Sequence, residues 1–134
     1  MTGGTETQRI VGRWVEKAEE DLTNARYTLT LKESCPYSTV CFHAQQVAEK
    51  YLKALLTFYA YPFPKSHDLL DLFRRLQNGP QLQLEQMDLG ILNRYSVEVR
   101  YPGDWEPITR EEAEEAVTLA EKVRSEVQRF LEQA

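Results

Sequence analysis

The stretch over residues 38–59 places the strongest constraint on how this chain can fold, because apolar residues cover close to half of its circumference as a helix. They are Val40, Cys41, Ala44, Val47, Ala48, Tyr51, Leu52, Leu55 and Leu56. A helix with so wide an apolar face must be covered on two sides, so the pattern predicts the central helix of a bundle. Gln45 projects into the same arc. Its buried amide needs a hydrogen-bond partner, which a second subunit could supply at an interface.

Three further segments have the spacing of amphipathic helices. Over residues 11–31 the apolar side chains fall within one arc roughly 100° wide. A short helix is predicted to begin with Ser66 as its N-cap. Another is predicted from the alignment on one face of Leu84, Met87, Ile91 and Tyr95.

A long last helix is predicted to begin at Thr109, because Thr109 and Glu112 have the form of a capping box. Its expected inner face consists of Ala113, Ala116, Val117, Ala120, Val123, Val127 and Phe130. No segment of useful length alternates in strand fashion, and six Gly and six Pro are too few for a turn-rich β-sandwich. We therefore predict an all-α fold, a four- to five-helix up-and-down antiparallel bundle, as a single domain over residues 10–134 after a flexible tail over 1–9.

Composition excludes several classes of protein. The 134 residues carry 16 basic and 21 acidic side chains, a net charge of -5, so a protein that coats duplex DNA is not expected. The longest uncharged apolar stretch is too short to span a bilayer, and no signal peptide is visible. Two cysteines that do not form a CxxC are interpreted as free thiols, which favours a cytoplasmic location.

The polar face of residues 38–59 carries the most functional information. His43, Gln46, Lys50 and Lys53 lie within about 80° of one another on the helical wheel. Such a row of donors suits an anion, a phosphate or the edge of a base, and the alternative is an ordinary solvated face. Asp21, at the border of the first helix's apolar stripe, is expected to pair with Lys50 as a structural contact.

Two other groups of residues are candidates for binding. In Ser66-His67-Asp68, a helix start accounts for Ser66 and Asp68, whereas His67 could bind a ligand or shuttle a proton. Around a predicted loop, basic and aromatic residues alternate and could clamp a phosphate and stack on a base. These are Arg94, Tyr95, Arg100 and Tyr101.

A metal site is not expected, because Cys41 and His43 point about 160° apart on a helix and no HExxH motif is present. No glycine-rich phosphate loop occurs either. We predict no metal and no cofactor.

Three segments together resemble the small prokaryotic HEPN domain proteins. They are Phe42–Leu55 (FHAQQVAEKYLKAL), Ser66-His67-Asp68-Leu69 and Arg100-Tyr101-Pro102. The resemblance extends over roughly residues 10 to 132. It implies a homodimeric helical bundle that binds nucleotides or RNA and acts with a minimal nucleotidyltransferase in a toxin–antitoxin-like pair.

Other branches of that family are metal-independent ribonucleases, marked by an Arg followed by a His after four to six residues. Here no His follows any Arg at that distance, because the chain's histidines are His43 and His67. We therefore name no catalytic residue. The nucleotide-binding surface that the resemblance implies consists of His43, Gln46, Lys50, Lys53, His67, Asp68, Arg100 and Tyr101. The leading hypothesis is a nucleotide- or RNA-binding module, and the alternatives are a divergent ribonuclease and a dimeric scaffold.

Overall fold

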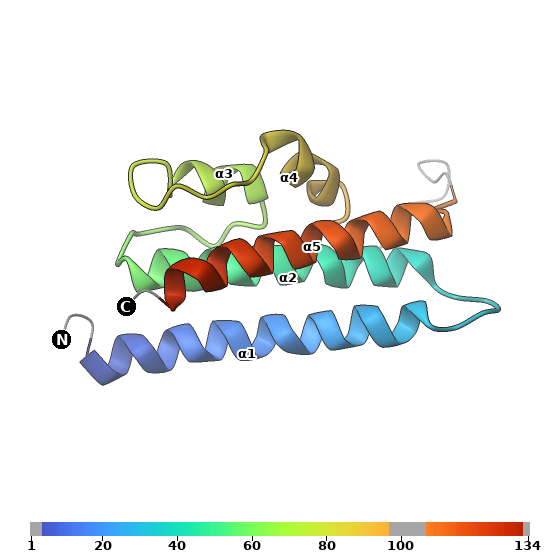
Figure 1. Cartoon of the computed structure of the whole chain (residues 1–134), viewed down its shortest axis with the longest axis horizontal. Coiled ribbons are helices and arrows are strands. Elements are labelled where there is room, and N and C mark those ends of the chain that lie inside the picture. Colours follow the sequence, from blue (N-terminus) through green and yellow to red (C-terminus); the bar gives the residue numbers. More distant parts are fainter. Residues whose placement is uncertain (1–3, 97–106, 133–134) are drawn as a thin grey trace.

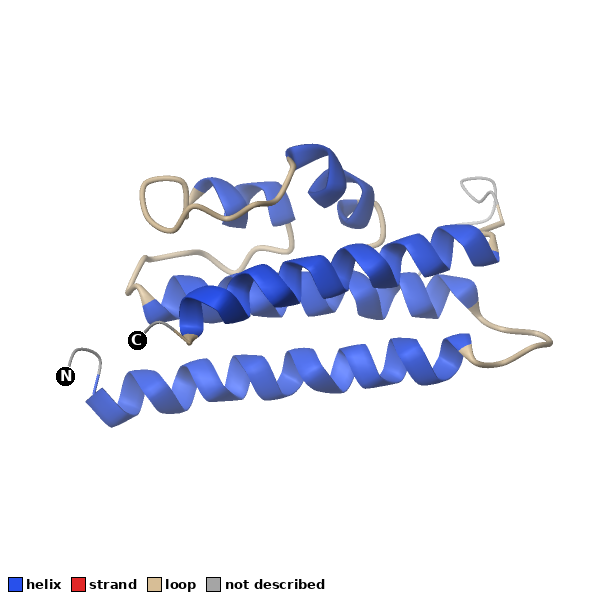
Figure 2. Ribbon diagram, viewed as in Figure 1, coloured by secondary structure: helices blue, strands red, loops and turns tan. Residues whose placement is uncertain are grey.

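The computed structural model describes residues 4–96 and 107–132, and within these ranges it contains helices and loops but no strand (Figure 2). The helices are α1 (Gly4–Leu29), α2 (Tyr37–Phe58), α3 (Leu69–Arg74), α4 (Gln86–Asn93) and α5 (Arg110–Leu131). The all-helical class is confirmed. No helix in the described ranges combines the length and apolar character needed to cross a bilayer.

The long helices α1, α2 and α5 lie along the long axis of the molecule (Figure 1). α2 runs antiparallel to α1, while α3 and α4 form a short layer that carries the chain back, so that α5 runs in the direction of α2 (Figure 1). α2 contacts all four other helices. The prediction that α2 is the central helix is confirmed.

The core forms around the apolar face of α2. All nine apolar residues predicted for this face are 0% exposed. α1 contributes Ala18, Leu22 and Ala25, and the described core of α5 contains every residue predicted for its inner face except Phe130, which is partly buried. Burying this contiguous apolar surface is the main force that holds the bundle together.

α1 begins at Gly4, well before the predicted start at Val11. Residues 4–9, which we assigned to the flexible tail, are therefore helical. Glu6 in the first turn favours this extension because it lies at the positive end of the helix dipole and pairs with Arg9 at 2.7 Å. The assignment of a domain to residues 10–134 stays a prediction.

The two short helices differ in detail from the prediction. Asp68, not Ser66, is the N-cap of α3, and its carboxylate accepts a hydrogen bond from the Leu70 amide at 3.0 Å. In α4, Met87 is 73% exposed and the buried residues are Leu89 and Leu92. The prediction that Leu84, Met87, Ile91 and Tyr95 share one helical face is wrong. Leu84 and Tyr95 lie outside the helix, so a single helical wheel does not describe their directions.

A polar network links the three long helices through Glu19. The Arg124 Nε lies 2.6 Å from the Glu19 carboxylate, the Tyr51 hydroxyl donates to the same carboxylate, and Gln128 donates to Tyr51 at 3.3 Å. Burial and the bond to Glu19 raise the pKa of Tyr51 to about 12. Burial acts to raise the pKa of Glu19, but the bonds from Arg124 and Tyr51 outweigh it and hold that pKa below its usual range.

Thr109→Ala should lower the free energy of unfolding by about 1 kcal/mol. The Thr109 side chain accepts from the Glu112 amide at 3.1 Å and Glu112 returns a bond to the Thr109 amide, as the predicted capping box requires. Urea denaturation measures the change. Thr118→Ala, at an exposed position inside α5, is the matched control and should cost nothing, because Ala is the better helix former; equal losses would contradict the capping role.

Glu19→Gln should make stability less dependent on acid pH. The pKa of Glu19 is lower in the folded state than in the unfolded state. The contribution of Glu19 to the free energy of unfolding is therefore fully present above the unfolded-state pKa, and it is lost as the pH falls through the folded-state pKa. Between about pH 6 and about pH 3 the wild type should therefore lose more stability than the variant. Glu20→Gln, which removes a carboxylate paired with Lys17 at 3.5 Å on the surface, should follow the wild type. Parallel pH profiles for wild type and Glu19→Gln would refute the assignment.

Candidate functional site

Asp21 on α1 holds two side chains of α2, and these three residues are called the Asp21 unit. The His43 Nδ1 lies 2.7 Å from one carboxylate oxygen and the Lys50 Nζ lies 2.5 Å from the other. His43 and Lys50 can both reach Asp21 because seven residues span about two helical turns and bring them to the same side of α2. The predicted pairing of Asp21 with Lys50 is confirmed.

Glu49 on α2 forms a second group of the same composition, called the Glu49 unit, with Lys53 and His67. The Lys53 Nζ lies 3.0 Å from Glu49, and the His67 Nδ1 lies 3.1 Å and 3.2 Å from the two carboxylate oxygens. Glu49 is 3% exposed. A carboxylate buried to this extent needs charged or hydrogen-bonding partners, and Lys53 and His67 supply them.

Two glutamines complete the Glu49 unit. The Nε2 of the fully buried Gln45 donates to the His67 carbonyl at 3.1 Å and to Glu49 at 3.3 Å. Gln46 Nε2 donates to the Gln45 Oε1 at 2.7 Å and reaches Glu49 at 3.4 Å. The partner that Gln45 requires is thus found in its own chain and not in a second subunit.

Three of the four donors predicted as a row, His43, Lys50 and Lys53, differ in their accessibility. The side chains of His43 and Lys50 are 21% and 22% exposed. Lys53 is 6% exposed, and its ammonium lies 5.5 Å from the centre of the Trp14 ring. Lys53 is therefore an interior cation that neutralises Glu49, while His67, 72% exposed, presents its ring to solvent.

Both imidazoles are oriented in the same way. An ionised carboxylate can only accept, so each Nδ1 carries the proton and donates it, which leaves Nε2 directed away from the carboxylate. Within residues 4–96 and 107–132, no partner is seen for the Nε2 of His43 or of His67. Each Nε2 can accept a proton or, once protonated, donate to an anion.

The remaining predicted residues in the described part of the chain have other contacts. Asp68 caps α3 and accepts from Asn93 Nδ2 at 2.9 Å, a bond that lowers the pKa of Asp68. Asp68 therefore has a structural role here. Arg94 stacks on the ring of Tyr95, with 5.7 Å between guanidinium and ring centre, and Tyr95 is 5% exposed. Arg100 and Tyr101 lie outside the described residues.

Sequence reasoning did not identify Glu49 as the centre of a site. The available signal was its spacing of four residues from Lys53, which places the two side chains on the same face of a helix. Nothing in the spacing could show that His67, from the loop before α3, meets the same carboxylate. In the described residues there is no cluster of three or more His, Cys, Asp or Glu side chains that could hold a metal ion.

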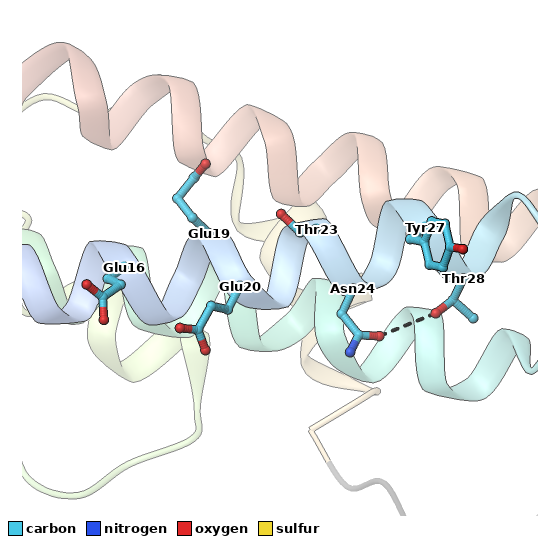
Figure 3. A pocket seen from close by; sticks show the side chains of 7 residues that line it. All are labelled: Glu16, Glu19, Glu20, Thr23, Asn24, Tyr27 and Thr28. Carbon is cyan, nitrogen blue, oxygen red and sulfur yellow. Dashed lines mark hydrogen bonds between the residues drawn. The ribbon is translucent and has the colours of Figure 1, made fainter.

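Two concavities lie along α1, apart from the predicted residues. One, of about 560 Å³, is lined by Glu16, Glu19, Glu20, Thr23, Asn24, Tyr27 and Thr28 (Figure 3). Its glutamates would repel a phosphate. The other, of about 380 Å³, is lined by Arg9, Ile10, Arg13, Trp14 and Lys17. Because Trp14 also contacts Lys53, this basic concavity borders the Glu49 unit.

Glu49→Gln should destabilise the protein by about 3 to 5 kcal/mol, because it leaves the buried Lys53 ammonium without a counter-charge. Adding Lys53→Met should recover a large part of the loss. Urea denaturation measures both. Glu121→Gln, which breaks a surface pair with Arg26 at 2.6 Å, is the control and should cost at most about 1 kcal/mol. A cost for Glu49→Gln no larger than this control would contradict the role assigned to Glu49.

Comparison with known proteins identifies a family. The model of the HEPN domain family matches residues 11–130. The crystal structure of TT1696 from Thermus thermophilus is similar, with 30% sequence identity, a TM-score of 0.71 and coverage of 89% of this chain and 96% of that one. The crystal structure of ST0689, an archaeal HEPN homologue, has 26% identity, a TM-score of 0.65 and coverage of 88% and 94%. No curated protein matches this chain.

Proposed function

The chain belongs to the HEPN domain family, and from this premise we propose that it is a nucleotide- or RNA-binding helical module. The proposed site extends along α2 from the Asp21 unit to the Glu49 unit. The family resemblance adds Arg100 and Tyr101, which lie outside the described residues, to this proposal. The observation that carries the proposal is the repeated arrangement in which a carboxylate orients one imidazole and neutralises one lysine.

The chemistry of the two units suits a phosphate beside a base. Lys50 uses one of its three N–H donors on Asp21, so the others are free to contact a phosphate oxygen. A protonated His67 adds a charge-assisted donor from an accessible ring. Because Asp21 and Glu49 already balance the two lysines, we expect specific and moderate binding instead of the strongly salt-dependent binding of a basic surface.

We propose two assemblies, which are a homodimer and a complex of that dimer with a protein partner. Three large apolar side chains at or beside α1 are 36% to 77% exposed, and they are Ile10, Tyr27 and Leu31. Burial of these side chains would favour a homodimer. We further propose that the dimer acts in the cytoplasm with a minimal nucleotidyltransferase in a toxin–antitoxin-like system. The support for this partner is the family resemblance of residues 42–55, 66–69 and 100–102.

A divergent metal-independent ribonuclease is the second candidate function. It is favoured by the two imidazoles, since a ring held at Nδ1 by a carboxylate is arranged for proton transfer at Nε2. Against it stands the absence from the sequence of the Arg and His spacing that marks the family's ribonucleases. RNA cleavage in the presence of a chelator, abolished by His67→Ala, would establish this function in place of simple binding.

The binding function predicts a saturable rise in Tm when nucleotide is added. At about 100 times Kd the shift should be about 10 °C, since binding to the folded state alone adds about 2.7 kcal/mol. Lys50→Ala and His67→Ala should each reduce it. Differential scanning fluorimetry with a panel of nucleoside triphosphates and a short single-stranded RNA makes the measurement.

The matched control is Lys32→Ala, which removes an exposed lysine in the loop after α1 and should leave the shift unchanged. A shift that survives both site variants would place the ligand elsewhere. The absence of any shift or RNA cleavage, together with a loss of stability in Lys50→Ala, would favour the dimeric scaffold.

A further inference from the structure

The outer side of α1 carries a regular stripe of exposed side chains. In the described part of the chain α1 packs on α2 and α5 and on no other helix, and it forms one side of the molecule (Figure 1). The stripe is turned by about 130° from the side that buries Ala18, Leu22 and Ala25. Its six residues are all exposed and are called the α1 seam; they are Ile10, Arg13, Lys17, Glu20, Asn24 and Tyr27.

The spacing of the α1 seam is that of a coiled coil. Its residues follow one another after three and four positions in turn, which is the repeat that lets two α-helices pack along their length. Apolar side chains stand at its two ends, where Ile10 is 36% and Tyr27 is 77% exposed. The middle is polar and charged, and such residues weaken a helix pair but determine its register. The seam therefore fits a second helix with the same distribution of side chains.

Charge is divided between the two halves of this side of α1. The concavity nearer the N-terminus is lined by basic side chains and no acidic one; the basic residues are Arg9, Arg13 and Lys17. The concavity that follows is lined by acidic side chains and no basic one; the acidic residues are Glu16, Glu19 and Glu20 (Figure 3). A second α1 that runs in the opposite direction complements both halves, whereas a parallel one would bring like charges together.

We infer that the protein dimerises through the α1 seam with the two α1 helices antiparallel, an inference that rests on the homodimer in the proposed function. The six positions are symmetric about the midpoint between residues 18 and 19. With the two-fold axis at this midpoint, every residue of the seam faces another one, and each contact occurs twice. Lys17 faces Glu20 of the partner subunit, Arg13 faces Asn24 of the partner subunit, and Ile10 faces Tyr27 of the partner subunit.

The two polar contacts are chemically matched. Lys17 and Glu20 lie 3.5 Å apart within one chain and are 53% and 62% exposed, so in the dimer four side chains of alternating charge meet at the axis. For the Arg13 guanidinium no partner is seen within residues 4–96 and 107–132. It can donate to the partner's Asn24, whose Oδ1 accepts one bond from Thr28 at 3.3 Å and has a second lone pair (Figure 3).

The apolar contact at each end of the seam supplies the hydrophobic part of the interface, because the dimer covers Ile10 and Tyr27. An interface of two helices with a polar middle is small, so we expect a Kd of about 10 to 100 µM. Below about 1 µM protein the chain is then monomeric, and urea denaturation at such concentrations reports on the single chain.

Analytical ultracentrifugation of the full chain, up to about 500 µM protein, tests the charge contact. Lys17→Glu places a carboxylate against Glu20 of the partner subunit, and Glu20→Lys places an ammonium group against the partner's Lys17. Each variant should weaken dimerisation at least about tenfold. The double exchange Lys17→Glu with Glu20→Lys restores opposite charges and should return Kd to within about threefold of the wild type. An equimolar mixture of the two single variants should form a heterodimer.

The matched control is Glu115→Lys, the same charge change at an exposed position of α5, which should dimerise as the wild type does. Recovery in the double exchange excludes misfolding as the cause of the losses. A wild-type dimer that neither charge reversal weakens would place the interface elsewhere, which overturns the inference while the homodimer stands. Wild-type protein that stays monomeric would leave the α1 seam to solvent or to another protein. Both the inference and the homodimer would then fail, while the nucleotide-induced rise in Tm would be unaffected.

Disulfide cross-linking tests the direction of the two helices. Arg13→Cys and Asn24→Cys are made in a Cys35→Ser background, in which the remaining Cys41 is buried. On oxidation at about 500 µM protein, a mixture of the two variants should form a linked dimer and neither variant alone should do so. In the antiparallel pair two copies of position 13 lie about 16 Å apart along the helix axis, too far for a disulfide. Linked dimers of each variant alone would indicate parallel helices and overturn the inference.

Discussion

The carboxylate of Glu49 is the constraint on which the rest of the site depends. It lies on the central helix with 3% of its surface exposed, where an unpaired charge would be too costly to keep. Its partners must therefore come from the structure around it. Lys53 meets it from the next turn of α2, and His67 meets it from the loop that precedes α3. One buried charge thus ties a loop to the core helix and fixes the orientation of an exposed ring.

Asp21 is paired in the same way with one imidazole and one ammonium group. Here α1 supplies the carboxylate, and α2 supplies both the imidazole and the ammonium group. In both units the interaction that holds the helices in register also orients a histidine. The proposed ligand site therefore uses the same side chains that stabilise the fold. The two glutamines add a further link, because the buried Gln45 donates to the His67 carbonyl and accepts from the partly exposed Gln46.

The helical class and the central place of α2 could be predicted because burial follows helical periodicity closely when a wide face is apolar. The capping box at Thr109 and the pair between Asp21 and Lys50 were predicted for similar local reasons. Short elements were less predictable. α3 and α4 have too few turns for periodicity to decide which face is buried. The structure therefore has Asp68 as the N-cap where Ser66 was predicted, and it has Met87 on the surface.

By itself the sequence determined which residues are donors and acceptors and on which side of α2 they lie. Only the tertiary structure decided which of them are accessible to solvent. Lys53 and Lys50 look alike as sequence, but packing places the ammonium of Lys53 between Glu49 and Trp14 and leaves Lys50 partly exposed. Likewise, His67 meets Glu49 across a separation of 18 residues. Helical spacing has no information about such contacts, because they depend on how the loop before α3 packs against α2.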